Sequence, residues 1–269
     1  MVLRVGLLGC GAIGREIAKA IDIGRLPAVL AAVSDSDPSR AEALISSLQN
    51  RPELVGFDEL ASRCDLLVEA ASQAAVRSAA EAALSQGRDI MIMSVGALMD
   101  RALFSDLVAL ARRGGGRVFL PSGAIAGLDG IRSAREGGLT SVTLTTTKPP
   151  AGLEGAPYVL ERGLDLRSLH QPTMIYQGPA SQAVLAFPAN VNVAASLSLA
   201  SGIDATVRVV ADPNARVNTH EILAEGAFGR MAIRIENVPS PSNPKTSYLA
   251  ALSAIATLRA AAESVRVGT

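Results

Sequence analysis

The sequence contains few of the residues from which disulfide frameworks, metal centres and aromatic clusters are built. Among its 269 residues there is no Trp, and Tyr and Phe number three and five. The two cysteines, Cys10 and Cys64, are too few for a disulfide framework or a metal cage. Two histidines, His170 and His220, without a neighbouring cluster of Cys or Asp, form no zinc-binding pattern. We therefore expect no metal, and the chemistry must come from a cofactor or from sparse side chains.

Charge and long apolar runs are also lacking, which excludes two classes of partner. Lys and Arg together number 25, as do Asp and Glu, so the chain has no basic field for nucleic acid or an anionic membrane surface. No stretch reaches the roughly 18 uninterrupted apolar residues that a bilayer span needs. The first residues show neither a basic region nor a signal-peptide core. We expect a cytoplasmic globular protein that binds neither nucleic acid nor membrane.

Strand-like and helical segments alternate over residues 1–121. Apolar runs typical of buried strands occur at 2–8, 27–33, 65–71, 89–94 and 117–121. Helical stretches lie between them, among others at 40–48, 73–86 and 101–112. This alternation predicts an α/β fold, a Rossmann-type doubly wound parallel sheet that forms a dinucleotide-binding domain over residues 1–121.

The pattern changes after residue 121. Strand-like runs occur at 141–147, 205–210, 217–224 and 231–238, and a Gly-rich loop joins the last two as in a hairpin. A second α+β domain with a largely antiparallel sheet is expected over residues 122–243. The Pro-rich segment 239–245 is predicted to be a polar loop. Residues 244–269 are expected to supply a C-terminal helix that packs back on the first domain.

A glycine-rich motif follows the first predicted strand and opens the first predicted helix. Gly9 permits a tight turn, Gly11 lets the backbone approach a pyrophosphate, and Gly14 allows close packing of helix on strand. Asp35 ends the second predicted strand, where its carboxylate accepts hydrogen bonds from adenine ribose hydroxyls and repels a 2′-phosphate. Arg40 lies near enough to leave NADP open beside NAD. The predicted cofactor-binding residues of this domain are Gly9, Gly11, Ala12, Ile13, Gly14 and Asp35.

Other segments have both a functional and a structural interpretation. His220 lies in a strand-like run, where a histidine is usually structural, but imidazole suits proton transfer near working pH without a large pKa shift. Asn190 stands at a helix start, where an amide caps the helix or binds a nicotinamide carboxamide. The loop before the last helix is either a capped linker or a carboxylate site made by Asn243, Lys245 and Thr246.

Five segments in this order resemble the L-aspartate dehydrogenase family, and the resemblance spans the chain. They are Gly9-x-Gly11-Ala12-Ile13-Gly14, Ser122-Gly123-Ala124-Ile125-x-Gly127-Leu128-Asp129, Pro188-Ala189-Asn190-Val191-Asn192-Val193-Ala194, Asn218-x-His220-Glu221-Ile222 and Glu236-Asn237-x-Pro239-Ser240-x-x-Asn243-Pro244-Lys245-Thr246-Ser247. The first is shared by many dehydrogenases, whereas the other four are more specific. Ala126 stands where the family pattern leads us to expect Gly.

The resemblance implies a reaction and the residues that carry it. His220 is implied as the catalytic acid/base, and Asn190 and the backbone of Ala124 as contacts of NAD. L-aspartate and NAD(P)+ would give iminoaspartate, which hydrolyses to oxaloacetate and ammonia or feeds quinolinate and hence NAD biosynthesis. The strand-like runs 205–210 and 217–238 offer a sheet surface for a homodimer, as two-domain dehydrogenases often use.

Two alternatives remain at this point. The chain resembles, more distantly, other two-domain enzymes such as homoserine dehydrogenase or dihydrodipicolinate reductase, although the His-His-rich stretch expected of the latter is absent. A non-catalytic NAD-binding sensor is the other alternative. In a sensor His220 would be dispensable.

Overall fold

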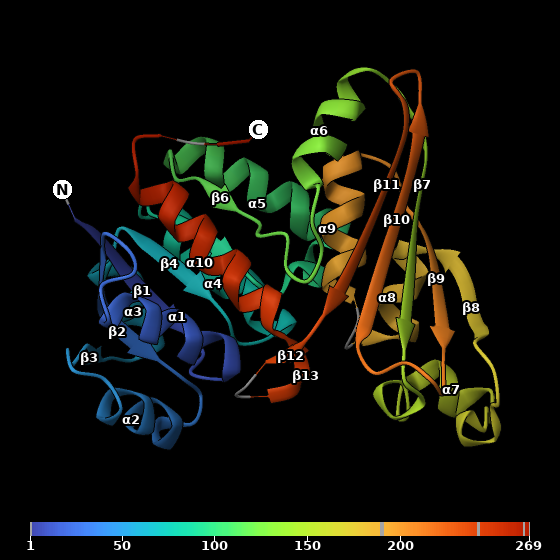
Figure 1. The fold of residues 1–269 in the computed structure, drawn as a ribbon. Coiled ribbons are helices and arrows are strands. Elements are labelled where there is room, and N and C mark those ends of the chain that lie inside the picture. The colour runs from blue at the N-terminus through green and yellow to red at the C-terminus, as the bar shows by residue number, and fades with distance from the viewer. Residues whose placement is uncertain (1, 189–190, 241–242, 266, 269) are drawn as a thin grey trace. The chain divides into compact units, whose positions relative to one another are not determined.

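The computed structural model describes residues 2–188, 191–240, 243–265 and 267–268 (Figure 1). The chain divides into two compact units. The first unit contains residues 1–121 and 250–266, and the second contains residues 122–249 and 267–269. Within the described residues, no helix is both long and apolar enough to cross a bilayer.

The first unit is built on a six-stranded sheet whose order is β3-β2-β1-β4-β5-β6. All its strand pairs are parallel, so the predicted Rossmann-type sheet is confirmed. Its strands are β1 (Leu3–Leu8), β2 (Ala28–Ser34), β3 (Glu53–Leu54), β4 (Leu66–Glu69), β5 (Asp89–Ile92) and β6 (Val118–Phe119). Its helices are α1 (Ala12–Asp22), α2 (Pro38–Ser46), α3 (Phe57–Leu60), α4 (Val76–Leu84), α5 (Arg101–Gly114) and, from the end of the chain, most of α10 (Tyr248–Ala262).

Local sequence sets where several of these helices begin and end. The Asp37 carboxylate accepts a hydrogen bond from the backbone N–H of Ser39, and Pro38 occupies the first turn of α2. Asp100 caps α5 in the same way. Gly115 ends α5 in the left-handed region, at φ 76°, which a residue without a Cβ adopts at little cost. The helix boundaries in this unit therefore follow from capping chemistry.

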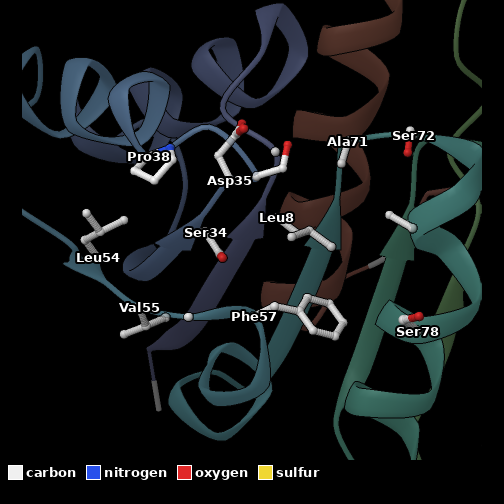
Figure 2. Close-up of a pocket in the computed structure, with 14 residues that line it drawn as sticks. Leu8, Ser34, Asp35, Pro38, Leu54, Val55, Phe57, Ala71, Ser72 and Ser78 are labelled. Atoms are coloured by element: carbon white, nitrogen blue, oxygen red, sulfur yellow. The ribbon is translucent and has the colours of Figure 1, made fainter.

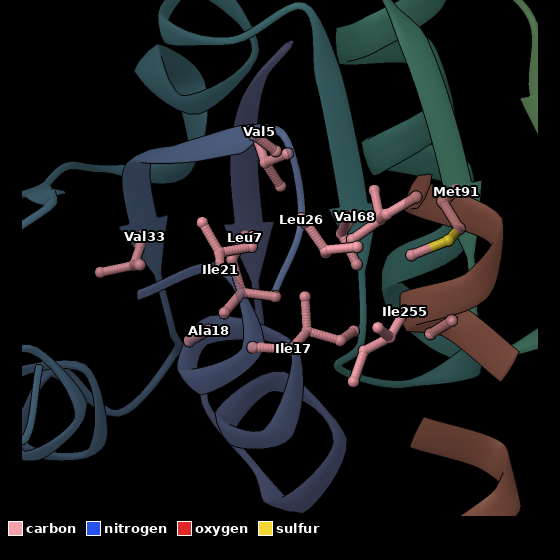
Figure 3. Packing of buried hydrophobic residues seen from close by; sticks show 14 of the residues in the cluster. Val5, Leu7, Ile17, Ala18, Ile21, Leu26, Val33, Val68, Met91 and Ile255 are labelled. Atoms are coloured by element: carbon pink, nitrogen blue, oxygen red, sulfur yellow. The ribbon is translucent and has the colours of Figure 1, made fainter. Parts of the chain in front are cut away.

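One apolar cluster joins distant parts of the chain within the first unit (Figure 3). Val5 and Leu7 of β1 pack with Ile17 of α1 and with Ile255 and Leu258 of α10. All five side chains are at least nine-tenths buried. Each contributes roughly 1.5–3 kcal/mol of hydrophobic free energy on burial. The last helix is thus an integral part of the core of the first unit.

The second unit contains a five-stranded sheet in the order β11-β10-β7-β9-β8. Only β7 and β9 pair in parallel among these neighbours, so the predicted largely antiparallel sheet is confirmed. The strands are β7 (Leu139–Lys148), β8 (Thr173–Pro179), β9 (Thr206–Ala211), β10 (Asn218–Gly226) and β11 (Gly229–Asn237). The helices of this unit are α6 (Leu128–Glu136), α7 (Pro157–Glu161), α8 (Ala180–Ala186) and α9 (Val191–Ser201).

The two faces of this sheet differ in character. Val142, Leu144, Ile222 and Ala224 are buried on the face that packs against helices α6 and α9 (Figure 1). The opposite face carries threonines of β7 and charged residues, among which Arg234 pairs with Glu221 at 2.9 Å. The alternation of strand residues explains this division, since successive side chains point to opposite faces.

One local prediction was wrong. Residues 239–245 were expected to be a loop, but β12 (Pro239–Ser240) and β13 (Asn243–Ser247) pair as a short antiparallel hairpin. Pro239 lies at the first position of β12, where a residue without an N–H is tolerated in a strand. The last helix accordingly begins at Tyr248, after this hairpin.

Candidate functional site

The glycine motif of the first unit has little room for side chains. Gly9 has φ 98°, and a Cβ added there would lie 2.6 Å from the carbonyl oxygen of Ala70. A Cβ on Gly14 would lie 2.1 Å from the carbonyl oxygen of Gly9. Gly11, in contrast, faces open space and precedes α1 without a side-chain cap. The first backbone N–H groups of α1 therefore remain available to phosphate oxygens, as a dinucleotide requires.

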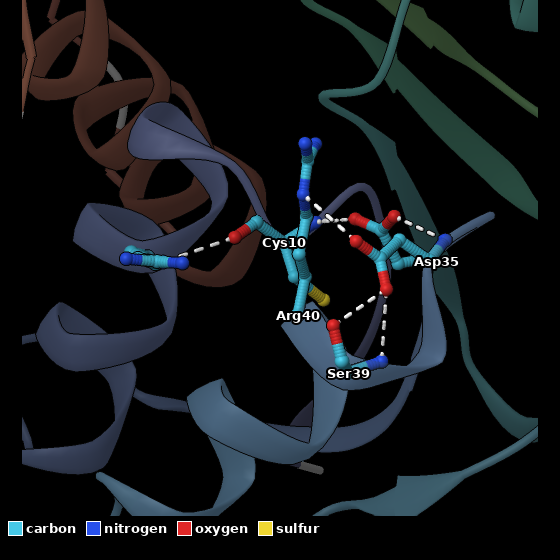
Figure 4. Close-up of polar contacts among 6 residues, drawn as sticks. Cys10, Asp35, Ser39 and Arg40 are labelled. Atoms are coloured by element: carbon cyan, nitrogen blue, oxygen red, sulfur yellow. Dashed lines mark hydrogen bonds and ion pairs between the residues drawn. The ribbon is translucent and has the colours of Figure 1, made fainter.

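Asp35 ties the glycine motif to the end of β2 (Figure 4). Its Oδ2 accepts a hydrogen bond from the backbone N–H of Cys10 at 2.7 Å, and its Oδ1 accepts one from Asp37 N–H at 2.9 Å. Each carboxylate oxygen has a further lone pair, which can accept a ribose hydroxyl. Arg40 forms an ion pair with Asp37 at 3.3 Å. The structure thus gives Asp35 a positioning role that the sequence did not predict.

A cavity of about 670 Å³ lies beside these residues, at the carboxyl ends of β1 and β2 (Figure 2). Leu8, Val55 and Phe57 supply apolar walls, and Asp35 supplies a carboxylate. Apolar walls suit a planar base, while the carboxylate suits the hydroxyls of its sugar. In parallel sheets of this order, ligands bind where the strand order reverses, which is between β1 and β4 here. The residues present fit the adenosine half of a dinucleotide.

Glu69, at the end of β4, holds the neighbouring loops in place. It is fully buried, and its Oε1 accepts hydrogen bonds from the backbone N–H groups of Ala71 and Ser72 at 2.8 and 3.0 Å. Its Oε2 accepts one from the backbone N–H of Ser94 at 3.0 Å. Burial raises the pKa of the carboxyl group, and the hydrogen bonds from these residues oppose that shift. Sequence reasoning missed Glu69, although an acidic residue that ends an apolar strand was a usable signal.

Both cysteines are buried thiols. Burial raises the pKa of Cys10 and of Cys64 to about 11, so both stay protonated near neutral pH. Cys10 lies within the glycine motif, where its backbone rather than its sulfur makes the contact with Asp35. Neither thiol is a nucleophile in this environment.

His220 lies on the buried face of the sheet in the second unit. It pairs across the strands with Thr146 of β7 and Ile235 of β11 and is 3% exposed. The Oγ1 of Thr146 lies 3.0 Å from Nδ1 of His220, within hydrogen-bond distance. When Nδ1–H donates to this hydroxyl, Nε2 carries the lone pair that accepts a proton. The contact with Thr146 thus restrains the Nδ1 side of the ring.

The pKa of His220 departs from what the sequence predicted. Burial, and secondly the positive charge of Lys148, lower the pKa to about 4 from its ordinary value of 6.5. The expectation of an imidazole without a large pKa shift is therefore wrong for this state of the protein. The ring is neutral at neutral and alkaline pH, which is the protonation state of a proton acceptor.

Lys148 ends β7 and is the second titratable group of this region. Its side chain is half-buried, and desolvation lowers its pKa to about 8 from 10.5. It lies two residues beyond Thr146 on the same strand, so both side chains project from one face. Sequence reasoning did not select Lys148, because its proximity to His220 depends on the register between β7 and β10.

Ala124 belongs to a loop that precedes α6 in the second unit. The Nδ2 of Asn237 donates a hydrogen bond to its carbonyl oxygen at 2.9 Å. Gly127 ends the loop at φ 76°, in the left-handed region. Ala124 is thus held through its backbone, the part by which the resemblance implies contact with NAD.

The remaining predicted residues are distributed as follows. Asn190 lies outside the described residues, immediately before α9. Asn243 and Lys245 contribute backbone to β13, and Thr246 of the same strand is half-buried. His170 is exposed in an irregular segment. The structure groups the glycine motif with Asp35 and groups His220 with Thr146 and Lys148.

Comparison with known proteins extends over both units. Residues 129–261 match the family described as Aspartate dehydrogenase, C-terminal, and residues 9–121 match the one described as Homoserine dehydrogenase, NAD binding domain. An L-aspartate dehydrogenase of Methanosarcina acetivorans is 51% identical, with 100% of both chains covered. The chain belongs to the L-aspartate dehydrogenase family. An L-aspartate dehydrogenase of Nitrosopumilus maritimus is 45% identical, with 99% of each chain covered.

A solved structure agrees with this membership of the L-aspartate dehydrogenase family. The crystal structure of aspartate dehydrogenase from Thermotoga maritima has a TM-score of 0.77 and 27% identity, and 99% of each chain is covered. The resemblance inferred from the five sequence segments is therefore confirmed, as is NAD(P) as the cofactor.

Proposed function

We propose that the protein catalyses the NAD(P)-dependent oxidative deamination of L-aspartate to iminoaspartate, which hydrolyses to oxaloacetate and ammonia. Relatives named L-aspartate dehydrogenase, up to 51% identical over their whole length, support this reaction. The observation that carries the proposal is His220, a neutral imidazole held by Thr146 at 3.0 Å on a buried sheet face.

The cofactor is held by residues that suit its parts. The backbone of Gly9, Gly11, Ala12, Ile13 and Gly14 would bind the pyrophosphate, and Asp35 the adenosine ribose. The resemblance to the family also implies that Asn190 and the backbone of Ala124 contact the cofactor. When bound, the nicotinamide supplies a hydride acceptor. Asp35 favours NAD over NADP by charge repulsion of a 2′-phosphate, and the pairing of Arg40 with Asp37 adds to this preference.

His220 moves the protons of the reaction. It accepts a proton from the α-ammonium group of L-aspartate, which leaves an amine with a free electron pair. That pair forms the C=N bond as hydride leaves Cα, so the product is iminoaspartate. After releasing this proton to solvent, His220 accepts a proton from the water that adds to the imine carbon, and its return to the substrate nitrogen lets ammonia leave. Asn243, Lys245 and Thr246 are the substrate-binding candidates that the sequence offers for the carboxylates.

Further parts of the proposal concern the cell and the assembly. The product iminoaspartate would be used in the cytoplasm for NAD biosynthesis. The face of the five-stranded sheet opposite α6 and α9, with β9, β10 and β11, is the surface we propose for a homodimer. Light scattering of the purified protein tests this, and a monomer at micromolar concentration would contradict it.

The decisive experiment measures NADH formation with NAD+ and L-aspartate, L-homoserine or L-glutamate as substrate. His220→Ala is compared with His170→Ala, because His170 is an exposed histidine on an irregular segment. We expect turnover with L-aspartate that only His220→Ala abolishes, while NAD binding survives in both variants. Turnover with L-homoserine alone would identify homoserine, and not L-aspartate, as the substrate. NAD binding without turnover of any amino acid would favour a sensor.

A further inference from the structure

Lys148 and His220 lie on one face of the sheet in the second unit. Thr146 is the cross-strand partner of His220, and the two side chains are 3.0 Å apart. Because alternate residues of a strand share a face, Lys148 projects from the same face at the carboxyl end of β7. Lys148 is therefore a diagonal cross-strand neighbour of His220, and its positive charge lowers the pKa of the ring.

A cation beside a buried imidazole opposes the acceptance of a proton. The neighbours of His220 within the sheet are apolar or uncharged, namely Ile235 on β11, Ile222 on its own strand and Thr146 on β7. Helix α9, which contacts β7, has no ionisable residue in its sequence. Within the described residues, Lys148 is the charged group that shifts the pKa of His220. A carboxylate placed beside Lys148 would offset this charge and favour the acceptance of a proton by His220.

We propose that Lys148 binds a carboxylate of the dicarboxylate substrate beside His220. The inference rests on the proposed function and adds a substrate-binding residue that neither the sequence motifs nor the comparisons assign. A charge-assisted hydrogen bond from a partly desolvated ammonium group is a strong way to hold a carboxylate. The lysine therefore selects for an anionic substrate at the position where the proton is transferred.

Substrate binding then raises the basicity of His220, the proton acceptor. The carboxylate offsets the positive charge of Lys148, so the pKa of His220 rises from about 4 when substrate is bound. The same pairing raises the pKa of Lys148 from about 8. His220 thus becomes a stronger base only when a dicarboxylate is in place.

The test uses succinate, a dicarboxylate without an amino group, so that binding is measured apart from turnover. Calorimetry compares the wild-type protein with Lys148→Met, Lys148→Arg and Lys19→Met, all saturated with NADH. Lys19 is exposed on α1 and serves as the matched control for loss of a lysine. We expect Lys148→Met to weaken succinate binding by roughly 10- to 100-fold, Lys148→Arg to restore part of it, and Lys19→Met to leave it unchanged.

The titration of His220 is a second readout, since the chain has only two histidines and His170→Gln assigns their NMR signals. We expect the pKa of His220 to rise in Lys148→Met without ligand, and to rise in the wild type on addition of succinate. Succinate affinity of the wild type should fall above pH 8, where Lys148 of the succinate-free protein deprotonates, and should stay level in Lys148→Arg.

Equal succinate affinity in the wild type and in a folded Lys148→Met variant, as judged by circular dichroism, would overturn the inference. A pKa of His220 that succinate does not change would also overturn it. If the wild type turns over L-aspartate in either case, the proposed function stands without Lys148. If the wild type neither binds succinate nor oxidises L-aspartate, the proposed function itself fails.

Discussion

Asn237, at the end of β11, donates a hydrogen bond from Nδ2 to the carbonyl oxygen of Ala124 at 2.9 Å, although 113 positions separate the two residues. Asn237 is 3% exposed, so water does not replace its side chain as the donor to the Ala124 carbonyl when the bond is lost. This contact ties the backbone of the loop that precedes α6 to the end of β11.

Replacement of Asn237 should therefore affect both stability and cofactor binding. Asn237→Ala leaves the Ala124 carbonyl without this donor, and we expect a loss of about 1–3 kcal/mol in the free energy of unfolding. If Ala124 contacts NAD, KM for NAD+ should also rise while KM for L-aspartate changes less. Urea denaturation and steady-state kinetics measure the two effects, and an unchanged KM for NAD+ would remove Ala124 from the cofactor site.

Thr146 should act through the orientation of His220. Thr146→Val keeps the size of the side chain but removes the hydroxyl at 3.0 Å from Nδ1, so the ring loses a preferred tautomer. We expect kcat to fall by about tenfold to hundredfold with little change in KM for NAD+. Thr146→Ser retains the hydroxyl and should retain most of kcat. Equal activity of the valine and serine variants would show that the hydroxyl is not needed.

The lowered pKa of His220 predicts how stability depends on pH. The unfolded chain binds a proton at His220 below pH 6.5, whereas the folded protein binds it only near pH 4. The contribution is fully present above pH 6.5 and is lost as the pH falls toward 4, with an upper size of about 3 kcal/mol. Urea denaturation at several pH values should show a smaller acid loss in His220→Gln than in the wild type. His170→Gln, the exposed control, should follow the wild type.

Asp35 should determine cofactor preference as well as the shape of the glycine motif. Asp35→Ala removes the acceptor of Cys10 N–H and the charge that repels a 2′-phosphate. We expect NAD+ binding to weaken by roughly tenfold or more, and NADP+ binding to weaken less or to improve. Fluorescence titration with NADH and NADPH checks this. The same ratio of affinities in variant and wild type would exclude Asp35 as the discriminating residue.

The sequence predicted most of the fold because its patterns are local. The motif Gly9 to Gly14 between an apolar run and a helix predicted β1, α1 and the parallel sheet, and the β-branched run at 141–147 predicted β7. The hairpin of β12 and β13 was missed, because its three prolines and two serines are more typical of a loop. In this segment, pairing between the two strands determines the secondary structure, although the local propensity for strand is low.

The candidate site was predictable only in part, for a different reason. Gly9, Gly11 and Asp35 could be proposed from the sequence because one short motif and one strand end contain them. The environment of His220 depends on which residue of β7 lies opposite it. This register between β7 and β10 cannot be deduced from the sequence of either strand alone. Lys148 therefore became a candidate only when the structure placed it on the face that His220 occupies.

Helix α10 completes the core of the first unit with residues that are synthesised after most of the second unit. Ile255 and Leu258 belong to the same buried cluster as Val5 and Ile17, and residues 122–249 form the second unit in between. During translation, the apolar residues of the first unit that contact α10 stay exposed until α10 has left the ribosome. The second unit can fold earlier, because its chain is nearly continuous. The protein should therefore depend on chaperones during translation more than its two compact units suggest.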